Sequence, residues 1–165
     1  AGADTIVVFE DDILLERFSP AVLQDCIDFL STDRHWNALY FGCLVSGSKK
    51  TQHRSVLKIK YRCLTHGYVF SRKFSESLVK KPWRDIPFDD FLCSINDEFY
   101  AIYPSFAFQS NSRSDNIRFL PLDKFRRLCG GLRQLQKRNE LYHRHRLLII
   151  LLHIIIILLI IMLAL

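Results

Sequence analysis

The last 19 residues limit what this chain can fold into more than any other feature. From residue 147 to residue 165 every side chain is apolar except that of His153. As an α-helix this run would be roughly 28 Å long, close to the hydrocarbon thickness of a bilayer. The alternative is the buried helix of a soluble core, but such helices normally keep a polar face. The sequence therefore predicts a C-terminal transmembrane helix over residues 147–165, in which His153 is tolerated as a neutral side chain.

The positive charge of the chain is concentrated just before this run. Residues 1–123 hold 15 Lys/Arg against 16 Asp/Glu, whereas residues 124–146 hold eight Lys/Arg against Glu140 alone. The two net charges, −1 and +7, together give the overall +6. The leucines of the basic segment predict an interfacial helix interrupted by glycines 130 and 131. These leucines are Leu128, Leu132, Leu135 and Leu141.

This charge distribution predicts where the chain sits in the cell. The positive-inside rule places the basic segment, and with it the soluble domain, on the cytoplasmic side of a membrane. The segment should also attract anionic lipid. Nucleic-acid binding is the competing interpretation, and we discount it because the membrane span accounts for the position of the charges. The 5 cysteines form no C-x-x-C pair, which favours reduced thiols over a disulfide framework or a zinc site.

The remaining residues predict one soluble domain of mixed α/β class, long enough to bury a core. A helix is expected to begin at Ser19-Pro20, with Ser19 as N-cap, and to continue through Leu30. Further helices are expected over residues 71–80 and 87–95, and strands over residues 5–9, 38–41, 56–61, 65–70 and 99–103. The polar stretches 46–54 and 106–116 are predicted to be loops.

Three acidic residues, Glu10, Asp11 and Asp12, directly follow the apolar strand predicted at residues 5–9. In an open α/β sheet, ligands bind at the carboxyl ends of the strands. Clustered carboxylate oxygens suit a hard divalent cation such as Mg²⁺ or Mn²⁺. On an extended chain Glu10 and Asp12 lie on one side. The pattern predicts a metal site that receives phosphate, with a solvated turn as the alternative.

Five segments are informative as a set: VFEDD at 8–12, WNALY at 36–40, THGYVFSRK at 65–73, PFDDFL at 87–92 and YAIYP at 100–104. Gln109 and the SDN run at 114–116 follow them. In order and spacing these segments resemble glycosyltransferase family 25, which includes lipooligosaccharide and procollagen galactosyltransferases. The resemblance covers about residues 3–117. It implies a GT-A fold, a UDP-galactose or similar UDP-hexose donor, Mn²⁺ or Mg²⁺, and inverting transfer to a glycan, lipid-linked or protein hydroxyl acceptor.

The resemblance assigns roles to the acidic motif and to one histidine. The metal would neutralise the leaving nucleoside diphosphate. Asp12 is the expected direct ligand, and Glu10 and Asp11 are expected to hold metal-bound water or donor hydroxyls. His66 is expected to reach the metal or the pyrophosphate, or else to be a hydrogen-bonded structural histidine.

The general base of an inverting transfer is expected at the helix over residues 87–95. Asp89 matches the family's Pro-x-Asp position and is the first choice, with Asp90 as the second. The alternative for Asp89 is a helix-capping acid. Ser71 is predicted to cap its helix, Trp36 and Tyr68 to lie in the core, and a loop that includes Gln109, Ser114 and Asp115 to close over the acceptor.

One departure from the family pattern affects the functional prediction. In the family the acidic motif follows strands and helices that hold uridine and ribose, whereas here it begins at residue 10. We therefore expect the C-terminal portion of a glycosyltransferase domain over residues 1–123, a basic juxtamembrane segment over 124–146, and a membrane anchor over 147–165. The alternatives are a non-catalytic, membrane-anchored remnant that binds partners or lipid, and a metal-dependent phosphoryl-transfer enzyme.

Overall fold

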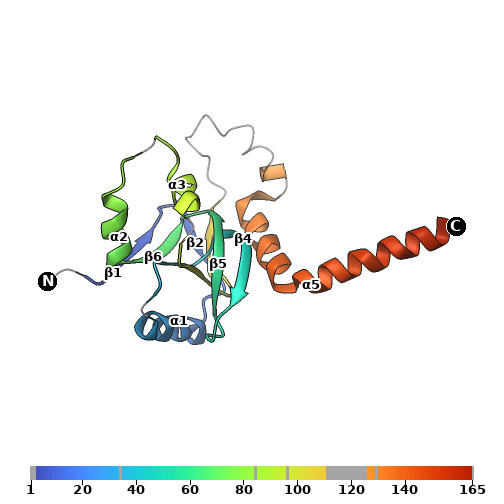
Figure 1. The fold of residues 1–165 in the computed structure, drawn as a ribbon, viewed down its shortest axis with the longest axis horizontal. Helices are drawn as coiled ribbons and strands as arrows, with labels where there is room; N and C mark the ends of the chain where they lie inside the picture. Colours follow the sequence, from blue (N-terminus) through green and yellow to red (C-terminus); the bar gives the residue numbers. More distant parts are fainter. Residues whose placement is uncertain are drawn as a thin grey trace.

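A computed structural model describes residues 3–33, 35–83, 85–95, 97–110, 126–128 and 130–164. Most of these residues form a mixed α/β domain from which one long helix extends (Figure 1). The strands are β1 Thr5–Phe9, β2 Ile13–Leu15, β3 Ala38–Tyr40, β4 Leu44–Lys50, β5 Val56–Cys63, β6 Gly67–Ser71, β7 Phe99–Ile102 and β8 Ala107–Gln109. The helices are α1 Pro20–Thr32, α2 Arg72–Val79, α3 Phe88–Ile95 and α5 Gly131–Ala164.

Six strands form the main sheet in the order β1-β6-β3-β7-β5-β4, and β2 and β8 form a separate antiparallel pair. Within the main sheet only β3 and β7 are paired in parallel. Because β6 is antiparallel to both β1 and β3, the strands β1, β3 and β7 run in the same direction. Their carboxyl ends therefore lie at one end of the sheet, as expected for the strand that precedes the acidic motif.

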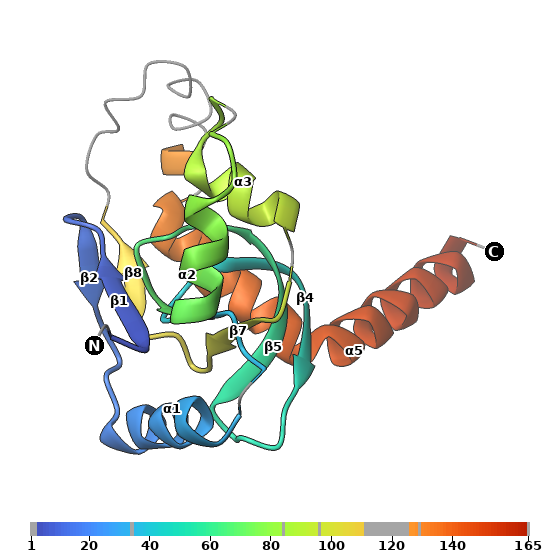
Figure 2. The ribbon, with the colours of Figure 1, turned by 60° about the vertical axis from the view of Figure 1, so that its left-hand side comes forward.

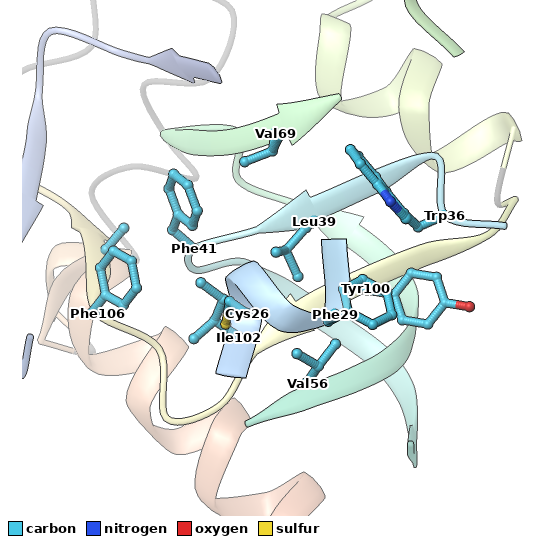
Figure 3. Close-up of a cluster of buried hydrophobic side chains, with 11 residues drawn as sticks. Cys26, Phe29, Trp36, Leu39, Phe41, Val56, Val69, Tyr100, Ile102 and Phe106 are labelled. Atoms are coloured by element: carbon cyan, nitrogen blue, oxygen red, sulfur yellow. The ribbon is translucent and has the colours of Figure 1, made fainter. Parts of the chain in front are cut away.

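Helices cover both faces of the main sheet. On one face Cys26 and Phe29 of α1 pack against Leu39 of the central strand β3 (Figure 3). On the other face Phe74 of α2 and Leu92 of α3 join a second core that includes Tyr40. Successive residues of β3 thus point to opposite faces, and both faces are buried. The result is a three-layer α/β/α arrangement, in agreement with the predicted class.

The strand β1 lies at an open edge of the sheet. Glu10 N–H donates to His66 O at 3.1 Å, and Asp4 O accepts from Arg72 N–H at 2.9 Å. In an antiparallel pair the backbone N–H and C=O groups of alternate residues bond to the neighbouring strand. The backbone groups of the even-numbered residues of β1 therefore point to β6, and those of Thr5, Val7 and Phe9 point to the edge of the sheet. Val7 and Phe9 are both 53% exposed. An apolar sequence typical of an interior strand therefore occupies an edge position.

Most predicted elements are confirmed, and two predictions are wrong. Residues 46–54 are not simply a loop, because β4 occupies Leu44–Lys50 and pairs with β5. Residues 106–116 are not loop throughout, because β8 occupies Ala107–Gln109 and pairs with β2. Neither β8 nor β2 was predicted from the sequence. The polar sequence of β4 reflects its edge position, where backbone pairing needs no apolar alternation. Two register shifts also interrupt its pairing.

The first part of α5 is packed on the domain. The helix begins at the predicted glycine break, and Gln136 is only 1% exposed and donates to Ala107 O at 2.9 Å. The Asn139 side chain donates to Val45 O at 2.9 Å and accepts from Val45 N–H at 3.0 Å. This one amide therefore satisfies both backbone groups of Val45 at the edge strand β4. Lys137 contacts Glu16 at 3.0 Å. The basic segment, expected at the membrane interface, is thus also bound to protein along this helix.

The second part of α5 leaves the domain. The backbone at His145 is not helical (φ −114°, ψ 21°), and the two parts of the helix meet there at an angle (Figure 2). Among the described residues α5 is the one helix long and apolar enough to cross a bilayer, and its most apolar window has a mean hydropathy of 3.2 with no burial against protein. This agrees with the predicted span, whose last residue, Leu165, is outside the described residues.

Candidate functional site

The first acid of the predicted motif, Glu10, is fixed at the end of β1. Its carboxylate accepts a 2.7 Å hydrogen bond from the Thr65 hydroxyl. Burial raises the pKa of Glu10, the Thr65 hydrogen bond opposes this, and the charges of Asp12, Asp89 and Asp11 raise the pKa further. These effects show that four carboxylates share one electrostatic environment. A cation bound there would relieve their mutual repulsion.

Asp12 lies at the same turn and combines one satisfied oxygen with one unsatisfied oxygen. Its Oδ2 accepts from the Gln109 amide at 2.8 Å, and its backbone carbonyl accepts from Ser110 N–H at 2.9 Å. Its Oδ1 is buried, and no residue in the described part of the chain donates a hydrogen bond to it. A buried acceptor without a partner is costly, which makes this oxygen available for a ligand. Asp11, by contrast, is exposed to solvent.

His66 presents a second unsatisfied lone pair. The side chain is fully buried, and Nε2 lies 2.9 Å from Ala107 O. Because a carbonyl oxygen only accepts, Nε2 carries the proton, and Nδ1 keeps a lone pair to which none of the described residues donates. Burial lowers the pKa of His66, although the Ala107 hydrogen bond and the nearby Asp12 and Asp89 oppose this shift. The neutral imidazole is therefore both structural, through Nε2, and available for a ligand, through Nδ1.

Asp89 is held by protein groups rather than left free. It lies in the first turn of α3, and its two oxygens accept from the Tyr61 hydroxyl at 2.7 Å and from Leu64 N–H at 2.9 Å. Leu64 has a left-handed backbone (φ 81°), an unfavourable conformation for a branched side chain. Asp89 thus fixes the segment that carries Thr65 and His66 into the site. Its place in the first turn of α3 agrees with the predicted acid at a helix start, and its role as a general base stays a prediction.

The donor set fits a metal only in part. Among the described residues no three His, Cys, Asp or Glu side chains are arranged to hold a metal ion together. Asp12 Oδ1 and His66 Nδ1 nevertheless offer one oxygen and one nitrogen, which Mn²⁺ accepts. Mg²⁺ and Mn²⁺ sites in phosphate-handling proteins commonly use one or two protein ligands, with water and substrate phosphates completing the shell. A cation held by these two atoms would need a phosphate ligand or water for the rest of its shell.

The other assigned residues divide into three groups. Ser71 caps α2, since its hydroxyl accepts from Phe74 N–H at 3.3 Å, and Trp36 and Tyr68 are buried core residues, as predicted. Gln109 is not in an acceptor loop, because it belongs to β8 and its amide donates to Asp12. The exposed Asp90 lies beside Asp89 in α3. The predicted loop residues Ser114, Asp115 and Asn116 lie outside the described residues.

Two residues that complete the site were not assigned from the sequence. Thr65 orients Glu10, and Tyr61 holds Asp89. The position of Thr65 next to His66 was the one available signal. Tyr61 gave none, because its hydroxyl meets a carboxylate 28 positions away. The site is therefore assembled from β1, β5, the segment before β6, and α3.

A cleft of 790 Å³ lies at the other end of the sheet, lined by Thr5, Asn37, Ser71 and Asp97 among others. It borders the start of β1, whereas the acidic motif follows the end of the same strand. The two regions are therefore distinct.

Comparison of the chain with models of known protein families finds no match, and comparison with curated proteins finds none either.

Proposed function

We propose that this chain carries the metal-binding part of a membrane-anchored, metal-dependent glycosyltransferase that transfers a hexose from a UDP-sugar to a hydroxyl acceptor. One observation supports this most strongly: Asp12 Oδ1 and His66 Nδ1 are buried and accept no hydrogen bond from any described residue, and the charge of Asp12 also acts on Glu10. Both residues occur in the segments that resemble glycosyltransferase family 25. A bound Mn²⁺ or Mg²⁺ would neutralise the negative charge of the nucleoside diphosphate that leaves the sugar.

The protein groups around that position would have separate tasks. Asp12 and His66 would hold the cation, and Glu10, with its raised pKa, would accept a proton or hold metal-bound water. Asp89 would act as a positioning residue that keeps Thr65 and His66 in place. If Asp89 is also the base, a second lone pair on one of its oxygens would take the proton while Tyr61 and Leu64 stay hydrogen-bonded to it. The exposed Asp90 is the alternative base.

The open edge of β1 supports the view that further strands complete the donor site. No described strand pairs with the backbone groups of Thr5, Val7 and Phe9 on this side, and the apolar side chains beside them are exposed. Long apolar edge strands are normally protected, because they invite pairing with another strand. We propose that strands that hold the nucleotide, supplied by other sequence of the same protein or by a partner chain, add to this edge.

A non-catalytic remnant is the second candidate, and one observation favours it. Both oxygens of Asp89 accept structural hydrogen bonds, so the predicted base also serves the fold. In such a protein the acidic motif would have only a structural role. The two candidates differ in whether the site binds a cation.

Thermal unfolding of the full-length chain in detergent with Mn²⁺ tests this difference. If Mn²⁺ binds the folded state at a concentration about 100 times its Kd, it stabilises the fold by about 2.7 kcal/mol. Mn²⁺ should raise the unfolding midpoint of the wild type and of the control Asp97→Asn by the same amount. Asp97 is an exposed acid at the other end of the sheet. Asp12→Asn should not respond. Equal shifts in the wild type and Asp12→Asn would reject the metal site and favour the remnant.

We further propose that the apolar part of α5 anchors the domain to a membrane with the domain on the cytoplasmic side, as the basic residues before it indicate. A chain that ends at His143 keeps the packed part of α5 and should be released from membranes. The full-length chain should resist carbonate and high salt, because hydrophobic insertion is not screened by ions. Digestion of the domain by protease outside sealed cells would contradict the orientation.

A further inference from the structure

Two arginines from distant parts of the chain line one cleft beside the kink in α5. The cleft has a volume of 530 Å³ and lies between the first turns of α1, the turn that joins β4 to β5, the residues after β7, and α5. Arg54 comes from the β4–β5 turn and Arg144 from the end of the packed part of α5. Both side chains are exposed to solvent.

The charges of the cleft favour an anion. The guanidinium of Arg144 lies 5.3 Å from the centre of the Tyr103 ring, which holds it in place without neutralising it. Among the described residues neither Arg54 nor Arg144 forms an ion pair. The one acid in the wall, Asp25, accepts from Ser55 N–H and pairs with His53 Nδ1 at 3.0 Å, so it stays ionised and the two arginines outweigh it by one positive charge.

The position of the cleft relative to α5 identifies where such an anion would come from. Arg144 precedes the apolar run at Leu147 by three positions, and because the backbone is not helical at His145 between them, the two residues are at most about 11 Å apart. The headgroup region extends roughly 5–7 Å beyond each side of the hydrocarbon core. With the apolar run in the bilayer, Arg144 lies within reach of lipid phosphates. Figures 1 and 2 both show β4, which ends at the exposed Lys49 and Lys50, beside the packed part of α5.

We propose that this cleft binds the phosphate group of an anionic membrane lipid, with Arg54 and Arg144 as the binding residues. A guanidinium matches the oxygens of a phosphate in a forked geometry, which a lysine cannot reproduce. Because the two arginines come from the domain and from α5, binding fixes the domain against the membrane surface. The proposal rests on the membrane anchoring proposed above, but not on the glycosyltransferase activity.

Hydrogen–deuterium exchange of the full-length chain in lipid nanodiscs tests the site. We compare nanodiscs of phosphatidylcholine alone with nanodiscs that also contain phosphatidylserine. The backbone amides of residues 51–57 should exchange more slowly in the anionic nanodiscs. Arg54→Gln and Arg144→Gln should each weaken binding by about fivefold, the factor expected for one basic residue at an anionic surface. The matched control Lys80→Gln, an exposed cation at the end of α2, should behave as wild type.

A second arm separates lipid from free phosphate. Glycerol 3-phosphate added to the neutral nanodiscs should protect residues 51–57 weakly or not at all. Equal protection by the soluble phosphate would overturn the lipid as ligand, and equal exchange in both nanodiscs would overturn the site. Equal protection in Arg54→Gln and wild type would also overturn it. Failure of the chain to enter nanodiscs at all would instead reject the anchoring, and the lipid site with it.

Discussion

Replacement of Asp89 by alanine should destabilise the domain strongly, because Asp89 accepts two hydrogen bonds from buried groups. Tyr61 is 1% exposed and Leu64 is 5% exposed, so neither donor reaches water easily once its acceptor is lost. An unsatisfied buried donor costs about 1–3 kcal/mol. For two donors beside a half-buried side chain we expect a loss of about 3 kcal/mol. In a domain of this size that lowers the unfolding midpoint by roughly 10 °C.

Asp89→Asn should cost about half as much, because an amide oxygen can still accept one of the two hydrogen bonds. Asp90→Ala is the matched control, since Asp90 occupies the same first turn of α3 but is exposed. It should change stability by no more than about 0.5 kcal/mol. Near-UV circular dichroism during heating in detergent follows the aromatic core and gives the three midpoints. If Asp89→Ala and Asp90→Ala unfold at the same temperature, the positioning role of Asp89 is refuted.

Three further substitutions test other parts of the structure. Gly42→Ala should disrupt the packing of α5, because a Cβ at Gly42 would collide with the Ala107 carbonyl oxygen and with the Gln136 amide of α5 that donates to it; faster tryptic cleavage within residues 131–144 would show this. Val7→Pro should be tolerated and Val8→Pro should not, since only Val8 N–H faces β6; equal unfolding midpoints would contradict the open edge. Acidification below about pH 6.5 should destabilise the domain, because the pKa of His66 is lower in the folded than in the unfolded state, so the unfolded chain binds the proton first. That acid-dependent loss should be smaller in His66→Gln, and an unchanged pH profile would speak against a buried neutral histidine.

Local patterns in the sequence were sufficient for most elements. Alternation and length identified β1, β3, β5, β6 and β7, and capping residues identified the starts of α1 and α2. The same reasoning failed for β4 and β8, which are polar or short and are held by pairing with β5 and β2. Nearly every residue type can form the same backbone hydrogen bonds. A strand that is held mainly by backbone pairing therefore needs no particular side-chain pattern, and its sequence does not predict it.

The candidate site shows the same division. The acidic motif, His66 and Asp89 were predicted from segments that resemble a known family, and in the structure the charges of Asp12 and Asp89 act on both Glu10 and His66. Only the tertiary structure decided that Asp89 accepts from Tyr61 and Leu64, whereas Asp12 Oδ1 and His66 Nδ1 accept from none of the described residues. Hydrogen-bond satisfaction depends on which groups meet across the fold, and no spacing in the sequence encodes it.

By itself, the sequence determined the apolar C-terminal run and its basic flank, because length and composition alone decide whether a helix can cross a bilayer. It also determined the mixed α/β class, through the periodicity of apolar residues. The tertiary structure decided that β1 is an open edge and that Arg54 and Arg144 share a cleft. The periodicity of a segment predicts that it has an apolar face. Which other segment covers that face, or whether the face stays exposed, depends on how segments distant in the sequence pack together.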